Sequence, residues 1–135
     1  MENKSAQMCH DLIMMLRQIK SGLLTVAEQY ELTPVQLGGL YAIQQGHATM
    51  GQVAHTMHCD ASNATGIVDR LVAQGLVERA ESAADRRVKT LQLTAKGQKV
   101  MDAAVEKLPA VMGCSSLSDS EQRIFHTIIN KLTAA

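Results

Sequence analysis

Basic side chains are concentrated in one short stretch of the sequence, residues 86–101. Its charged residues are all cations: Arg86, Arg87, Lys89, Lys96 and Lys99. An arginine at the tip of a hairpin can enter a narrow minor groove of DNA, where the negative potential is strongest. Arg86, Arg87 and Lys89 are therefore expected to contact DNA. A solvated run of charges without a partner is the alternative and the usual explanation of such a run.

Short polar side chains precede this stretch, in the first turns of a helix expected over residues 61–74. They are Ser62, Asn63 and Thr65. A helix fits the major groove, and its first two turns meet the base edges. The amide of Asn63 can pair with an adenine edge, whereas the hydroxyls of Ser62 and Thr65 are better suited to phosphates. Capping of the helix start by Ser62 and Asn63 is the competing interpretation.

Three further residues are weaker candidates for DNA contact. Arg70, beside Asp69, can clamp a phosphate or form an ion pair within the helix and the hairpin. Thr49 and Gln52 lie at the amino end of another expected helix, where free N–H groups can face a phosphate.

The elements that position these residues follow from the spacing of apolar side chains, which recurs in steps of three and four. Helices are expected over residues 6–30, 34–46, 50–58, 61–74, 95–113 and 119–132. Capping boxes at Thr33, Thr49 and Ser118 mark helix starts, and Pro109 is expected to kink the fifth helix or to mark a restart. The period changes to two over residues 76–81 and 88–93, which predicts an antiparallel hairpin.

This order of elements predicts a mainly α fold with a small two-stranded β wing. A short helix, a tight turn and a second helix have helix-turn-helix spacing, and the hairpin that follows is the wing. The first and last helices carry apolar stripes too long for so small a central module to cover. Because a wet apolar face is costly, we expect these N- and C-terminal helices to be dimerisation helices.

Part of the sequence resembles the signature of the MarR family of bacterial regulators. The matching segments are residues 60–71, 75–79, 85–87 and 91–97, within a stretch that runs without a gap from residue 33 to residue 100. The resemblance implies a homodimer on a palindromic double-stranded DNA operator, released by small molecules, oxidants or metals. It also implies that Asp85 fixes the wing tip while Arg87 reaches DNA. Many members carry a long basic side chain where Gly66 stands, so a base contact is absent here or a closer backbone approach replaces it.

Composition is consistent with one winged helix-turn-helix domain over residues 1–135. We divide it into a dimerisation helix at 6–32, a DNA-binding region at 33–95 and further dimerisation helices at 96–135. The chain is 46% hydrophobic and 19% charged, with thirteen cations against thirteen anions, so no global charge attracts a polyanion. No segment has the length and apolarity of a membrane span, and no export signal is visible at the start, so a cytoplasmic location is expected.

Candidate sensing residues are few. Cys9 lies where some redox-sensing relatives place a reactive cysteine, but it also lies on the apolar stripe, which favours a buried interface thiol. His55, His58 and Cys59 are too few and too close together to indicate a metal site, so no metal or cofactor is expected. A small effector, phenolic or otherwise, is consistent with the family resemblance.

Two other classes of function are less consistent with the sequence. A winged helix that binds a protein partner and has lost DNA binding is favoured slightly by the neutral total charge and by Gly66, and opposed by the basic wing. An enzyme is not expected, since the sequence contains no phosphate-binding loop, nucleophile elbow or paired carboxylates.

Overall fold

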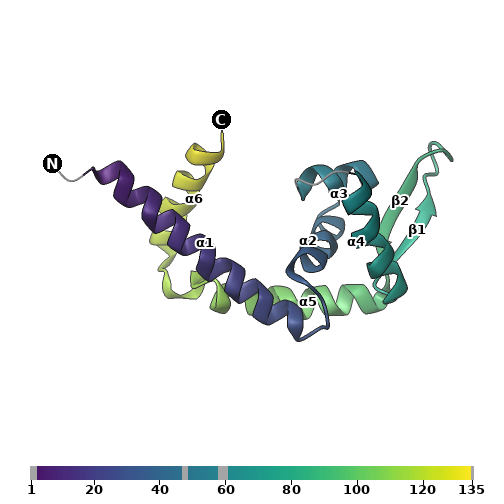
Figure 1. The fold of residues 1–135 in the computed structure, drawn as a ribbon, viewed down its shortest axis with the longest axis horizontal. Coiled ribbons are helices and arrows are strands. Elements are labelled where there is room, and N and C mark those ends of the chain that lie inside the picture. The colour runs from purple at the N-terminus through teal and green to yellow at the C-terminus, as the bar shows by residue number, and fades with distance from the viewer. Residues whose placement is uncertain (1–2, 47–48, 58–60, 135) are drawn as a thin grey trace.

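The described residues, 3–46, 49–57 and 61–134, form a U-shaped molecule in the computed structural model (Figure 1). Its helices and strands are α1 (Lys4–Glu28), α2 (Pro34–Gln44), α3 (Met50–Thr56), α4 (Ala61–Ala73), β1 (Val77–Glu81), β2 (Lys89–Leu93), α5 (Ala95–Val111), the 3-10 turn η1 (Cys114–Ser116) and α6 (Asp119–Thr133). One arm of the U contains α2, α3, α4 and the two strands, the other contains α6 and the first half of α1, and α5 joins the arms.

The helices begin where the capping residues predict. The side chains of Thr33, Thr49 and Ser118 each accept a hydrogen bond from the backbone N–H three residues on. The side chain of the Gln or Glu at that position accepts one from the backbone N–H of the cap residue. These reciprocal bonds satisfy N–H groups that have no partner inside the helix. The fifth helix does not restart at Pro109. It continues to Val111, and Gly113 then takes a left-handed conformation, with a φ of 77°.

The wing is a two-stranded antiparallel sheet. Its register pairs Val77 with Leu93 at the base and Glu81 with Lys89 toward the tip. An additional bridge joins Thr49, at the start of α3, to Thr90 in β2. Because Thr90 lies next to the Glu81–Lys89 pair, this bridge attaches the wing to the start of α3 near the tip end of the ladder.

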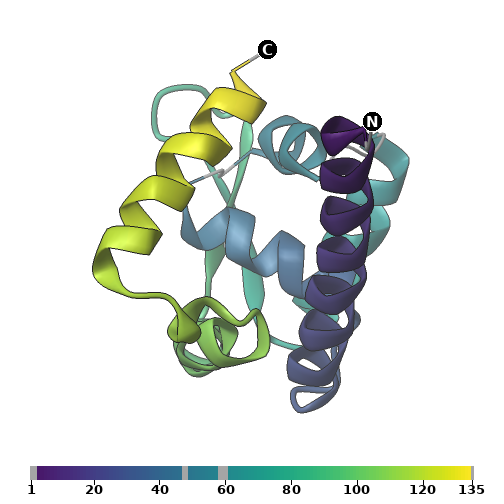
Figure 2. The same cartoon turned by 90° about the vertical axis from the view of Figure 1, so that its left-hand side faces the viewer.

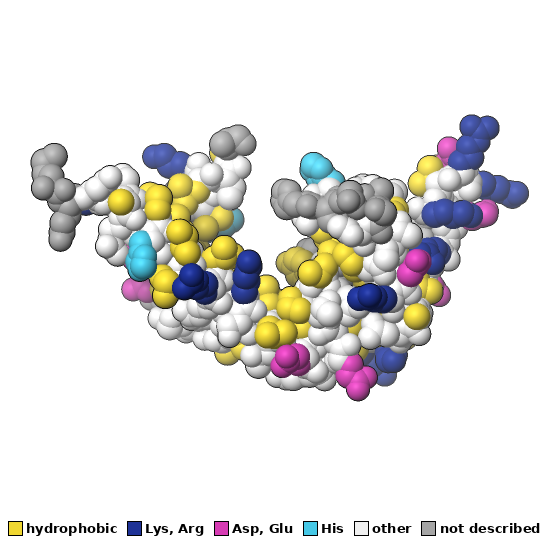
Figure 3. Space-filling view, in the orientation of Figure 1, with side chains coloured by type: hydrophobic (Ala, Val, Ile, Leu, Met, Phe, Trp, Pro, Cys, Tyr) yellow, Lys and Arg dark blue, Asp and Glu magenta, His cyan; other side chains and the backbone are white. Residues whose placement is uncertain are grey.

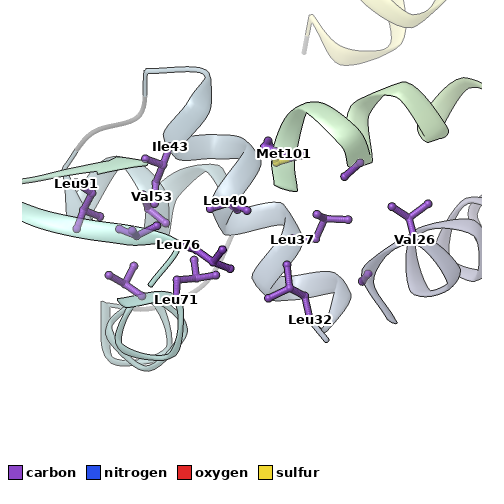
Figure 4. Packing of buried hydrophobic residues seen from close by; sticks show 14 residues of the cluster. Val26, Leu32, Leu37, Leu40, Ile43, Val53, Leu71, Leu76, Leu91 and Met101 are labelled. Carbon is purple, nitrogen blue, oxygen red and sulfur yellow. The ribbon is translucent and has the colours of Figure 1, made fainter. Parts of the chain in front are cut away.

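The core of the winged-helix arm is aliphatic, as the scarcity of aromatic residues predicts. Figure 4 shows its side chains converging from α2, α3, α4, the strands and α5. The largest fully buried side chains are Leu40, Leu71, Met101, Val26, Val53, Val68 and Val77. This core packs α4 against the wing.

Two glycines allow backbone segments to meet closely. At Gly97, in the first turn of α5, a Cβ would overlap the carbonyl oxygen of Leu76. At Gly22, where α1 crosses α5, a Cβ would lie 2.8 Å from the carbonyl oxygen of Val111. Side chains at these positions would push α5 away from the wing and α1 away from α5.

The second arm leaves its apolar side chains uncovered. No residue of α6 is buried, and the buried residues of α1 are Val26 and Ala27, near its carboxyl end. In Figure 2 this arm faces the viewer, and α1 and α6 are seen as two separate helices. Large apolar side chains on the two helices are solvent-exposed: Met8, Leu12, Ile13, Met14, Leu16, Leu24, Ile124, Phe125, Ile128 and Leu132. Within the described residues, no helix combines the length and apolarity that crossing a membrane requires.

Candidate nucleic-acid interface

Three parts of the winged-helix arm lie at one end of the molecule: α3, the amino end of α4 and the wing tip (Figure 1). Lys and Arg side chains project from the wing tip (Figure 3). A duplex lying across this end would meet all three parts together. Thr49, Gln52, Asn63, Thr65 and the tip residues 85–87 belong to these three parts, whereas Arg70 lies in the last turn of α4.

The wing tip is ordered by its own polar groups. The Oδ1 atom of Asp85 accepts a hydrogen bond from the backbone N–H of Arg87 at 3.0 Å, and the Oγ atom of Ser82 accepts one from Ala84 at 3.3 Å. Such bonds from Asp and Ser side chains stabilise turns. Asp85 thus occupies the position that the family resemblance implies, and the side chains of Arg86 and Arg87 are exposed beside it.

The basic stretch is not a uniform positive surface. Lys89 forms an ion pair with Glu81 across the strands, with 3.1 Å between Nζ and Oε1. Lys96 lies at the base of the wing and donates to the backbone oxygen of Gln74 at 3.0 Å. Among the described residues neither tip arginine forms an ion pair, so the positive charge of the wing is concentrated at Arg86 and Arg87. The strand register, not the linear sequence, brings the acid beside Lys89.

Helix α4 presents a polar face to solvent. Its buried side chains are Ala64, Val68 and Leu71, whereas Asn63, Thr65, Gly66, Asp69 and Arg70 are exposed. The side chain of Ser62 lies outside the described part of the structure. Of the four DNA candidates on this helix, Asn63, Thr65 and Arg70 thus lie on the accessible side.

An ion pair joins α4 to the wing, as the alternative for Arg70 predicted, but it is formed by other residues. Asp69 pairs with Arg79 of β1 instead. Arg70 is solvent-exposed and remains a candidate phosphate contact. This pair could not be assigned from sequence because Arg70 is the nearer cation along the chain.

Thr49 and Gln52 use their side chains to cap α3. The Oγ1 atom of Thr49 accepts from the N–H of Gln52 at 3.1 Å, and the Oε1 atom of Gln52 accepts from the N–H of Thr49 at 3.0 Å. A contact of Thr49 or Gln52 with DNA would therefore involve atoms other than those in these two hydrogen bonds. The exposed backbone at Gly51 lies between them.

The sensing candidates within the described residues lie on different elements. Cys9 and Cys114 are exposed on α1 and η1. His55 is exposed, while His58 and Cys59 lie outside the described residues. Across the described ranges, no three His, Cys, Asp or Glu side chains are placed to hold a metal ion.

An apolar cavity of about 340 Å³ lies between α1, α2 and α5, away from the wing. Its lining residues are Leu23, Pro34, Leu37, Gly38, Tyr41, Met101, Leu108 and Met112. None of these carries a charge. Local sequence patterns do not reveal this cavity, because its residues have the same helical spacing as a packed core.

A polar junction centred on Lys107 of α5 was not predicted either. The Nζ atom of Lys107 lies 2.8 Å from the hydroxyl of Tyr30, 2.5 Å from Oε1 of Gln29 and 4.8 Å from the centre of the Tyr30 ring. These contacts tie α5 to the end of α1. They join residues separated by almost eighty positions, so no local pattern reveals them.

The helix-turn-helix and its attached wing define a winged-helix protein. A family model described as the MarR family matches residues 30–88. The HTH-type transcriptional regulator YsmB of Bacillus subtilis, itself uncharacterized, is 31% identical over 110 residues, which are 79% of this chain and 75% of YsmB. The chain belongs to the MarR family of transcriptional regulators.

Two further proteins show how far this similarity extends. The HTH-type transcriptional repressor MdtR of Bacillus subtilis is 28% identical over 124 residues, covering 90% of this chain and 80% of MdtR. The structure of BpsR from Bordetella bronchiseptica, whose DNA binding is regulated by 6-hydroxynicotinic acid, covers 100% of this chain and 99% of its own, with a TM-score of 0.76 and 21% identity. The predicted fold class is thereby confirmed.

Proposed function

We propose that this MarR-family regulator is a ligand-responsive repressor that acts in the cytoplasm as a homodimer on a pseudo-palindromic DNA operator. The observation that carries the proposal is the common surface formed by the wing tip and the amino end of α4. Two exposed arginines at the tip suit the minor groove, and the polar face of α4 suits the major groove. A single duplex can engage both.

The second arm supports the homodimer. Ile124 on α6 is 61% exposed and Ile13 on α1 is 54% exposed, and both belong to long rows of apolar side chains. A second copy of the chain supplies matching apolar rows of the same length. Pairing two copies also places two α4 helices on one duplex, which reading two half-sites requires.

The cavity between α1, α2 and α5 supports control by a small molecule. A ligand there would touch both the end of the dimerisation helix and α2 of the DNA-binding arm. Because no charged residue lines the cavity, an unpaired carboxylate would lose its hydration without compensation. We therefore expect an uncharged, mainly apolar effector, which includes a neutral phenol with its hydroxyl near Tyr41. An uncharged effector of this kind would differ from 6-hydroxynicotinic acid, which regulates BpsR.

Control by an oxidant is the other form of response. Cys9 is exposed on α1, among the apolar side chains proposed to face the second copy. Oxidation to a polar sulfenic acid or a disulfide would alter that interface. A Cys9→Ser variant that still loses operator binding in peroxide would exclude this route.

Selection of duplexes from a random library tests the proposal directly. The full chain should enrich one inverted repeat and bind it with an affinity that falls steeply as salt increases. Enrichment of no sequence, together with salt-insensitive binding, would contradict a DNA-binding function. The protein-interaction module would then be the better explanation.

A further inference from the structure

Gly66 lies at the centre of the face that α4 turns to solvent. Side chains three and four positions apart share one face of a helix, so Asn63, Gly66 and Arg70 form a single row. The opposite face, with Ala64 and Val68, is buried in the core. Gly66 is therefore the residue of α4 that would come nearest to the floor of a groove in which this helix lay.

The fold of the free protein does not require a glycine there. Gly66 lies within the helix and lacks the positive φ found at Gly46, Gly75 and Gly113. A Cβ built on it meets no atom of the described residues within 4 Å. Glycine inside a helix is less favourable than alanine because the unfolded chain loses more freedom. The free protein thus carries a destabilising residue without a packing reason.

We propose that Gly66 lets the backbone of α4 approach the floor of the major groove, so that the short side chains beside it reach the base edges. This inference rests on the proposed DNA-binding function and specifies how its recognition helix is seated. The space that is empty above Gly66 in the free protein is filled by a base edge in the complex.

The neighbouring residues support close seating. A helix with its side chains is about 10–12 Å wide and the major groove about 12 Å, so small changes in side-chain size alter the depth of docking. The candidate readers Asn63 and Thr65 have short side chains that cannot span a gap left by a bulky neighbour. A glycine between Asn63 and Arg70 removes that neighbour.

The test compares two glycine-to-alanine variants of the full chain. Gly66→Ala should raise the Tm by about 2–5 °C, because alanine favours the helix. It should also weaken binding to the selected operator about tenfold, because a methyl group forced into a close-packed contact is costly. Binding to an unrelated duplex, which depends on phosphates, should be unchanged.

Gly38→Ala is the matched control. Gly38 is likewise exposed, lies inside α2 and has no atom within 4 Å of a built Cβ, but it lines the cavity rather than the DNA-facing surface. It should raise the Tm in the same way, which measures how much alanine at an open helix position stabilises the chain. Thr25→Ala, on an exposed part of α1 outside the cavity lining, is the control for affinity and should leave operator binding unchanged.

The outcomes separate the inference from the function on which it rests. If the wild-type chain binds its operator and Gly66→Ala binds it equally well, close seating is wrong while DNA binding stands. If the wild-type chain selects no duplex, both are wrong. A Gly66→Leu variant, with a larger side chain on the same open face, should lose more affinity than Gly66→Ala, and equal affinities for the two would also contradict the inference.

Discussion

Arg79 of β1 forms an ion pair with Asp69 of α4, which joins the wing directly to the helix proposed to enter the major groove. Their side chains are 38% and 57% exposed, so solvent screens the attraction. The pair therefore contributes more to the relative placement of wing and helix than to stability. Both DNA-contacting elements depend on that placement.

Removing this pair should affect binding more than folding. Asp69→Ala and Arg79→Ala should each change the free energy of unfolding by less than about 1 kcal/mol. Operator affinity, measured by fluorescence anisotropy, should fall several-fold in each. A double-mutant cycle tests the shared cause, because the double variant should bind nearly as well as the weaker single variant. Fully additive losses would show that the two residues act separately.

The wing tip should provide affinity for all sequences. Arg87→Ala should weaken binding to the operator and to unrelated duplexes alike. It should also reduce the slope of log affinity against log salt by about 2, because the dimer loses one arginine from each chain. Asp85→Ala should weaken binding although it makes the chain more positive, since Asp85 holds the backbone N–H of Arg87. Tighter binding by Asp85→Ala would show that total charge matters more than the turn.

Asn63 should contribute to sequence preference. Replacing it with alanine should relax the preferred base at one position in each half-site, because an Asn–adenine pair accounts for about 1–3 kcal/mol of discrimination. The readout is a binding profile over single-base variants of the operator. A uniform loss across all variants would instead assign Asn63 to phosphate contact or to capping of α4.

The exposed row on α6 should hold the dimer together. Ile128→Glu places a charge in that row and should convert the chain to a monomer at micromolar concentration, as measured by light scattering after gel filtration. Asn130→Asp adds the same charge on the other side of the helix and should remain dimeric. A monomeric wild-type chain, or a dimeric Ile128→Glu variant, would exclude α6 as the interface.

The cavity should discriminate by charge. A neutral aromatic ester should bind at least tenfold more tightly than the corresponding carboxylic acid at neutral pH and should release the operator. Gly38→Leu would project a side chain from the cavity lining and should abolish ester binding, whereas Val35→Leu, on an exposed part of α2 outside the lining, should not. Calorimetry on the full chain provides the affinities.

Local patterns were sufficient to predict most of the fold. The caps at Thr33, Thr49 and Ser118 depend on neighbours three residues away, and the strand alternation of the wing is equally local. The behaviour at Pro109 was harder to predict, because packing of α5 against α1 and η1 opposes a break in the helix.

The candidate site was predicted less completely, because its electrostatics depend on contacts between elements. Glu81 pairs with Lys89 because the strand register places the two residues opposite each other. Asp69 pairs with Arg79, and not with its sequence neighbour Arg70, because the wing packs on α4. The apolar cavity lies where α1, α2 and α5 meet, and residues of all three helices line it. None of these relationships is encoded by spacing along one segment.

A footprint of the full chain on its selected operator tests the central proposal most directly. A homodimer on its operator should give two chains per duplex and two protected major-groove segments. The centres of these segments should lie one helical turn apart, about 34–36 Å, or a whole multiple of that distance. Protection should extend into the flanking minor grooves, where the wing arginines lie. Protection of a single half-site by a monomer, or no protected segment at all, would contradict it.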